Sequence, residues 1–164
     1  MRYSDISHWM ATAGDLAPRP AVAGDHDFDV VVVGAGYTGL WTTWYLQQRE
    51  PGLRIAICEA EIAGYGASGR NGAWCSAGIG TTTGGLARRY GDQTARDVVH
   101  ALRDTVDEVG RVCDIAGIDA EFRKGGMLRI ARGDHEIDAL QAGADSYRRL
   151  GVANGLRQLS AGEL

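Results

Sequence analysis

The sequence has very few of the residues on which several common classes of protein depend. Lysine is nearly absent: 16 of the 17 basic residues are arginine, and Lys124 is the one lysine. No lysine follows a G-x-x-x-x-G run, which excludes a P-loop. The net charge is −4, from 17 basic and 21 acidic residues, and no basic stripe runs along the chain. These features argue against a nucleic-acid partner.

Cysteine, proline and long apolar runs are also scarce. The three cysteines, Cys58, Cys75 and Cys113, form no C-x-x-C pair, which favours a reducing compartment over a disulfide framework or a zinc site. We therefore expect no metal centre. Only three prolines and no G-X-Y period exclude a collagen-like fibre. No signal peptide and no run of roughly 18 apolar residues is present, so we expect a cytoplasmic protein without a membrane segment.

Glycine, in contrast, is abundant and unevenly distributed. It accounts for 24 of the 164 residues, and twelve of these lie between Gly34 and Gly85. That share is roughly twice the usual one. The chain is otherwise typical of a soluble globular protein, with 45% hydrophobic and 23% charged residues, and its length suits one domain.

The first glycine cluster lies inside a predicted βαβ unit. The run 30–33 is four valines, typical of a strand buried on both faces of a parallel sheet. The G-x-G-x-x-G motif of residues 34–39 follows and opens a predicted helix that ends before Pro51. A second predicted strand at 53–58 ends at Glu59. Strand, glycine turn, helix and strand within about 30 residues predict a βαβ unit.

Each glycine of the motif has a physical task in binding a dinucleotide. Gly34 allows the tight turn that leaves the strand. Gly36 has no side chain, so a pyrophosphate can approach the backbone. Gly39 lets the helix pack closely on the sheet. The N-terminus of the helix supplies N–H groups and a partial positive charge for the phosphates.

The acid after the second strand narrows the choice of cofactor. Glu59 would accept hydrogen bonds from the adenosine ribose. The next residues are Ala60 and Glu61, so no arginine is available for a 2′-phosphate, and NADP is disfavoured. The alternative is a βαβ unit that holds no dinucleotide.

The second glycine-rich stretch, residues 64–74, favours a flavin over a nicotinamide cofactor. It is long and neutral apart from Arg70, so its backbone could lie along an extended cofactor while Arg70 adds a fixed cation. The alternative is a flexible surface loop. Ser68 lacks the last glycine of a G-x-S-x-G elbow, which argues against a hydrolase.

The remainder of the chain is predicted to be mainly helical. Amphipathic patterns predict helices from Asp92 to Gly117 and from Asp134 to Leu150. Short strands are predicted at 121–124, 127–131 and 156–159.

Three segments together resemble a known family. They are 29–40, Glu59-Ala60 and 64–72, and they resemble the FAD-dependent oxidoreductases of the D-amino-acid oxidase type. Trp9 and the Pro-Arg-Pro arm after it are also similar to the gamma-glutamylputrescine oxidase branch of that family. Members usually have two glycines after the asparagine of the third segment, whereas here Gly72 is followed by Ala73.

The resemblance implies an α/β, Rossmann-like FAD-binding βαβ unit followed by the start of a mixed substrate domain, in a truncated chain. The implied divisions are an arm at 1–28, the FAD-binding unit and flavin loop at 29–85, and the incomplete remainder at 86–164. The implied FAD contacts are Gly34, Gly36, Tyr37, Thr38, Gly39, Glu59, Ala67, Ser68, Arg70, Asn71 and Gly72. We assign no catalytic residue.

The implied reaction is oxidation of the C–N bond of an amine or amino acid to an imine. The flavin would take the hydride, and oxygen or another acceptor would then take the electrons. Family members are more than twice as long, so we expect the chain to be the first part of a larger enzyme. The alternatives are a truncated product without activity of its own and an NAD-dependent dehydrogenase.

Overall fold

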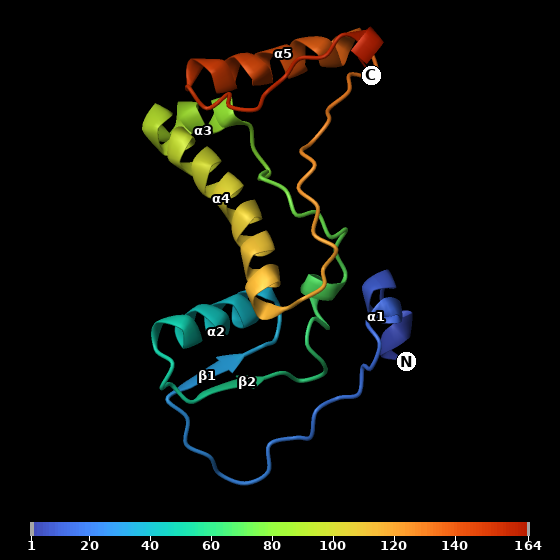
Figure 1. Cartoon of the computed structure of the whole chain (residues 1–164), viewed down its shortest axis with the longest axis vertical. Coiled ribbons are helices and arrows are strands. Elements are labelled where there is room, and N and C mark those ends of the chain that lie inside the picture. The colour runs from blue at the N-terminus through green and yellow to red at the C-terminus, as the bar shows by residue number, and fades with distance from the viewer. Residues whose placement is uncertain (1, 164) are drawn as a thin grey trace. The chain divides into compact units, whose positions relative to one another are not determined.

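The computed structural model describes residues 2–163, which form two compact units that divide between Trp74 and Cys75. The first contains the βαβ unit and the loop that follows it, and the second is helical (Figure 1). The domain limits predicted at 28/29 and 85/86 stay predictions.

The predicted βαβ unit is confirmed. Strand β1 (Val30–Val33) leads into helix α2 (Tyr37–Arg49), which ends before Pro51, and strand β2 (Ile55–Cys58) returns parallel to β1. The two strands are in register from the pair Val30 and Ile55 to the pair Val33 and Cys58. The carboxyl ends of both strands therefore lie side by side.

The sheet is covered on one face, in contrast to the expectation of burial on both. Val32 contacts α2, whereas Val31 and Val33 on the opposite face are 55% and 87% exposed. The expectation is wrong for residues 2–163 because α2, the main helix that packs on these two strands, leaves Val31 and Val33 uncovered. A run of valines indicates that burial of both faces of the strand is favourable. It does not supply the second element that would have to pack on the exposed face.

The N-terminal segment is partly folded. A 3-10 turn, η1 (Tyr3–Asp5), precedes the short helix α1 (His8–Thr12). The Ser7 hydroxyl accepts a hydrogen bond from the N–H of Met10 at 3.2 Å, which caps α1. Residues 13–29 have no regular secondary structure.

Three helices build the second unit: α3 (Thr83–Tyr90), α4 (Asp92–Ala116) and α5 (Asp134–Arg149). The predictions of α4 and α5 are confirmed, including the end of α4 at Gly117, whose φ is +63°. Helix α3 was not predicted. Its contacts with α4 and α5 surround a small apolar core made of Leu86, Ala87, Ala95, Val99, Leu150 and Val152.

The three short strands predicted in the second unit are wrong. Residues 121–124, 127–131 and 156–159 have no regular secondary structure, and a 3-10 turn, η3 (Ala161–Glu163), follows them. A strand needs a neighbour to satisfy its backbone N–H and C=O groups. Within residues 75–163 the structure provides no such neighbour.

Candidate functional site

The N-terminus of α2 lies at the carboxyl edge of the two strands, and its N-cap residue has no side chain with which to cap it. Gly36 is its N-cap, and Tyr37, Thr38 and Gly39 form its first turn. The first N–H groups of a helix have no acceptor within the helix. Together with the helix dipole, they make this position suited to an anion such as a phosphate.

Two glycines of the motif are required by the observed geometry. Gly34 has a φ of +97°, a backbone conformation that side chains disfavour, and its N–H donates to the carbonyl of Cys58 at 2.7 Å. A Cβ on Gly39 would overlap the carbonyl oxygen of Gly34 and would lie 3.2 Å from Val32. The helix therefore approaches β1 closely because position 39 has no side chain.

Glu59 directly follows β2 and bridges to the turn after β1. Its Oε2 accepts a hydrogen bond from the N–H of Ala35 at 2.8 Å, and its Oε1 accepts one from the N–H of Glu61 at 3.2 Å. The hydrogen bond from Ala35 is the main reason that the pKa of Glu59 lies below its usual value. This side chain is exposed and stays ionised at neutral pH, so it retains lone pairs for further donors.

The glycine-rich stretch after β2 folds back on the same edge. The N–H of Gly64 donates to the carbonyl of Ala35 at 2.9 Å. Further on, in the 3-10 turn η2 (Ala67–Gly69), the hydroxyl of Ser68 accepts a hydrogen bond from the N–H of Tyr37 at 2.9 Å. The Oγ of Ser68 also lies 3.0 Å from the position that a Cβ on Gly36 would occupy. The structure thus brings together the glycine motif, Glu59 and the start of the loop.

The last part of the predicted site is organised by contacts inside the loop. The guanidinium of Arg70 lies 4.8 Å above the ring of Tyr65, and its Nε donates to the Tyr65 carbonyl at 2.8 Å. The amide of Asn71 donates to the carbonyls of Ala67 and Ser68 at 3.2 and 2.9 Å. Gly72 follows and is exposed. Asn71 therefore stabilises the loop itself, a role that the sequence did not predict.

Ala73, at the position where the resemblance implies a second glycine, occupies a left-handed conformation. Its φ is +53°, and its N–H donates to Oδ1 of Asn71 at 2.7 Å.

We expect Ala73→Gly to stabilise the protein by about 0.5–1 kcal/mol, because glycine removes a left-handed strain of about 1–2 kcal/mol and adds a smaller entropy cost. Urea unfolding measures the difference. The exposed Ala63, which has no positive φ, is the matched control: Ala63→Gly is expected to destabilise, and equal effects at both positions would contradict the strain.

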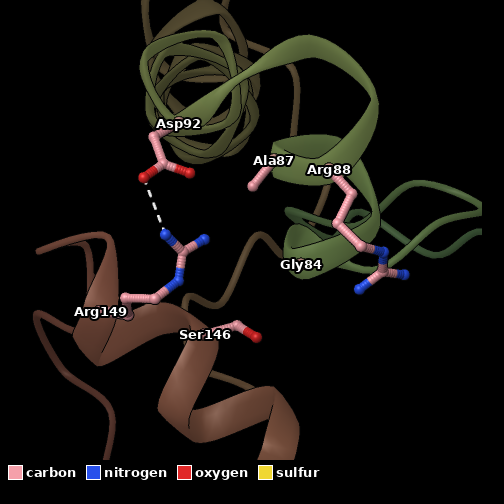
Figure 2. A pocket seen from close by; sticks show the side chains of 6 residues that line it. All are labelled: Gly84, Ala87, Arg88, Asp92, Ser146 and Arg149. Carbon is pink, nitrogen blue, oxygen red and sulfur yellow. Dashed lines mark hydrogen bonds and ion pairs between the residues drawn. The ribbon is translucent and has the colours of Figure 1, made fainter.

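The second unit has a hollow of about 400 Å³, lined by residues of α3, α4 and α5 (Figure 2). Asp92 and Arg149 face each other across it and form an ion pair at 2.7 Å. Arg149 holds the pKa of Asp92 below its usual value. Each of these charges neutralises the other, so we assign no ligand to this hollow.

Three further observations concern metal ligands, thiols and membrane-spanning helices. Among residues 2–163, no group of three or more His, Cys, Asp or Glu side chains is placed to hold a metal ion. Cys75 is exposed. No helix in that part of the chain is sufficiently long and apolar to cross a membrane.

Comparison with known proteins identifies relatives of this chain. Residues 29–164 match the family model described as FAD dependent oxidoreductase. Gamma-glutamylputrescine oxidoreductase of Escherichia coli is 30% identical over 145 residues, which cover 88% of this chain and 33% of that protein. Probable oxidoreductase OrdL of Haemophilus influenzae is 26% identical over 127 residues, which cover 77% of this chain and 29% of that protein. No solved structure matches the chain.

The chain spans about a third of the length of the curated relatives it matches. The match to the family model begins at Asp29, one residue before β1, and includes the glycine motif, Glu59 and the loop after β2. These are the three parts that the structure brings to one edge of the sheet. The chain belongs to the family of FAD-dependent oxidoreductases.

Proposed function

We propose that this chain is the FAD-binding part of an oxidoreductase that oxidises the C–N bond of a small amine or amino acid to an imine. The observation that carries the proposal is the shared location of three features: the N-terminus of α2 with glycine as its N-cap, the carboxylate of Glu59 and the loop held at Ser68. A dinucleotide needs an anion site, a ribose acceptor and a backbone surface along which to extend.

The residues present fit that cofactor. The pyrophosphate would lie at the first turn of α2, where Thr38 and Gly39 supply N–H groups beside that of Tyr37, whose acceptor in this structure is the hydroxyl of Ser68. Glu59 would accept hydrogen bonds from the adenosine ribose. The loop residues Ala67, Ser68, Arg70, Asn71 and Gly72 would follow the pyrophosphate, the ribityl chain and the ring.

The position of the loop also favours FAD over NAD. An NAD-dependent dehydrogenase would require residues 64–73 to be remote from the cofactor. The hydrogen bond between Ser68 and Tyr37, at 2.9 Å, instead places this loop at the N-terminus of α2. The loop and the glycine motif are therefore adjacent, as binding of one extended cofactor to both would require.

The substrate class comes from the relative in Escherichia coli, whose name gives gamma-glutamylputrescine, an amine. FAD, when bound, supplies the redox chemistry and accepts the hydride from the carbon beside the substrate nitrogen. Oxygen or another acceptor would take the electrons. We assign the substrate-binding and catalytic side chains to the part of the protein outside these 164 residues, and the chain alone would then bind FAD without turnover.

Glu59→Gln is the variant that tests the ribose site. We expect it to weaken FAD binding about 10- to 100-fold, because a hydrogen bond to a charged acceptor contributes about 1.5–3 kcal/mol. Titration of the purified chain with FAD, followed by flavin fluorescence, measures the dissociation constant. Glu50→Gln, at the opposite end of α2, makes the same change of charge and is expected to leave FAD binding unchanged.

The pH dependence gives a second readout of the same carboxylate. The pKa of Glu59 is lowered in the folded chain, so its contribution to stability is present above the ordinary pKa and is lost as the pH falls through the lowered one. FAD affinity should fall over the same acidic range in the native chain but not in Glu59→Gln. If the native chain binds NADH more tightly than FAD, the proposed function is wrong.

A further inference from the structure

The N-terminal segment lies against the loop that follows β2, although about fifty to sixty residues separate them in the sequence (Figure 1). We name Tyr3–Thr12, which comprises η1 and α1, the N-terminal clasp. It is joined to β1 only through residues 13–29, which have no regular structure and are almost entirely exposed. Its position therefore depends on its contacts with the loop.

The central contact is apolar. Met10 is 5% exposed and is the one fully buried residue of α1. Its Cε lies 2.9 Å from where a Cβ on Gly69 would be and 3.9 Å from the corresponding position on Gly64. The methionine therefore fills the space beside the backbone of the loop, and the absence of side chains at Gly64 and Gly69 makes this contact possible.

Two polar contacts flank the methionine. Nε1 of Trp9 donates to the carbonyl oxygen of Asn71 at 2.8 Å. The hydroxyl of Tyr3 donates to Oε2 of Glu61 at 2.8 Å. These hydrogen bonds join the clasp to both ends of the loop, close to Glu59 at one end and to Ala73 at the other.

The aromatic ring of Tyr3 extends this contact towards Arg70. It meets the ring of Tyr65 edge to face, with centroids 6.0 Å apart. The guanidinium of Arg70 lies over that same Tyr65 ring at 4.8 Å. Tyr3 therefore supports the platform on which the one cation of the loop rests.

We propose that the N-terminal clasp holds residues 61–74 in the conformation that receives the cofactor, with Tyr3, Trp9 and Met10 as positioning residues. The inference rests on the proposed function where it names FAD. The contacts by which the clasp holds residues 61–74 are present in the chain without cofactor. The two can therefore be tested separately.

The test measures amide hydrogen exchange of residues 61–74 in the 164-residue chain without FAD. Trp9→Phe retains an aromatic side chain and removes the N–H donor, so exchange should accelerate about three- to tenfold. Met10→Ala removes the buried contact, so acceleration should reach about 30-fold or more. Exchange in β1 and α2 should stay unchanged. The dissociation constant of FAD should rise in the same order of variants, because fewer molecules hold the competent loop.

Two variants are matched controls. Trp41→Phe makes the same chemical change on α2, and Ala11→Ser alters an exposed position of α1 itself. Neither should affect exchange in residues 61–74. If Trp9→Phe and Met10→Ala fold normally and leave that exchange unchanged, the clasp does not hold the loop. If both variants accelerate exchange but the native chain binds no FAD, the proposal that the clasp holds the loop is supported and the proposed function is wrong.

Discussion

Gly39→Ala is expected to abolish FAD binding and to destabilise the first unit by about 3 kcal/mol or more. The added methyl would overlap the carbonyl oxygen of Gly34 and would lie 3.2 Å from Val32. The obstacle is backbone, which cannot rotate away as a side chain can. The helix must therefore move away from β1, and its first-turn N–H groups move with it.

Circular dichroism during urea unfolding and titration with FAD measure the two effects. Gly143→Ala is the matched control, since Gly143 lies in α5 and a Cβ there would meet nothing within 4 Å. Alanine is the better helix former, so that variant should gain about 0.5–1 kcal/mol. Native-like unfolding and FAD affinity in Gly39→Ala would show that α2 does not need this close approach.

Gly69→Ala is expected to weaken FAD binding about 100-fold, the equivalent of about 3 kcal/mol, while the βαβ unit stays folded. A Cβ at this position would overlap the carbonyl oxygen of Gly64 and would press on Cε of Met10 at 2.9 Å. Gly64 must then shift, and with it the hydrogen bond that its N–H makes to the carbonyl of Ala35. The loop would leave the edge of the sheet.

The control for Gly69→Ala lies three residues earlier. Gly66 has a φ of −71°, and a Cβ there would meet nothing within 4 Å. Gly66→Ala should therefore retain FAD affinity within about threefold. The comparison separates a steric requirement at one glycine from a general need for a flexible backbone. Equal losses at both positions would indicate that flexibility of the loop, and not its packing, determines binding.

The parts of the fold that could be predicted are those determined by residues that are close together in the sequence. The valine run, the glycine motif and Pro51 define β1, the turn and the end of α2 within about 20 residues of one another. The long helix α4 was predicted from its apolar period and from Gly117. Pattern and structure agree there because the residues that mark each element lie within it or at its ends.

The parts that could not be predicted depend on distant partners. Helix α3 was missed because Thr-Gly-Gly at its start favours a turn; there the hydroxyl of Thr82 accepts from the N–H of Gly85, and Leu86 packs in the core. The predicted strand at 127–131 fails for the same kind of reason, since a pattern cannot supply the neighbouring strand.

The candidate site shows the same division. Gly34 and Gly39 were predicted for the reasons that their geometry confirms, a positive φ and a close approach of helix to strand. The role of Met10 could not be predicted, because no spacing in the sequence relates it to Gly69. The observed position of Arg70 likewise depends on the ring of Tyr65, which no motif in the sequence singles out.

The open edge of β1 has a practical consequence for every measurement on this chain. Four β-branched residues lie in a row, Val33 is 87% exposed, and β2 is the one strand paired with β1 among residues 2–163. No lysine or proline interrupts the run, and an open apolar strand edge is a template for strands of other chains. Each titration should therefore be repeated at several protein concentrations, because intermolecular β-pairing would lower the amount of monomer that can bind a ligand.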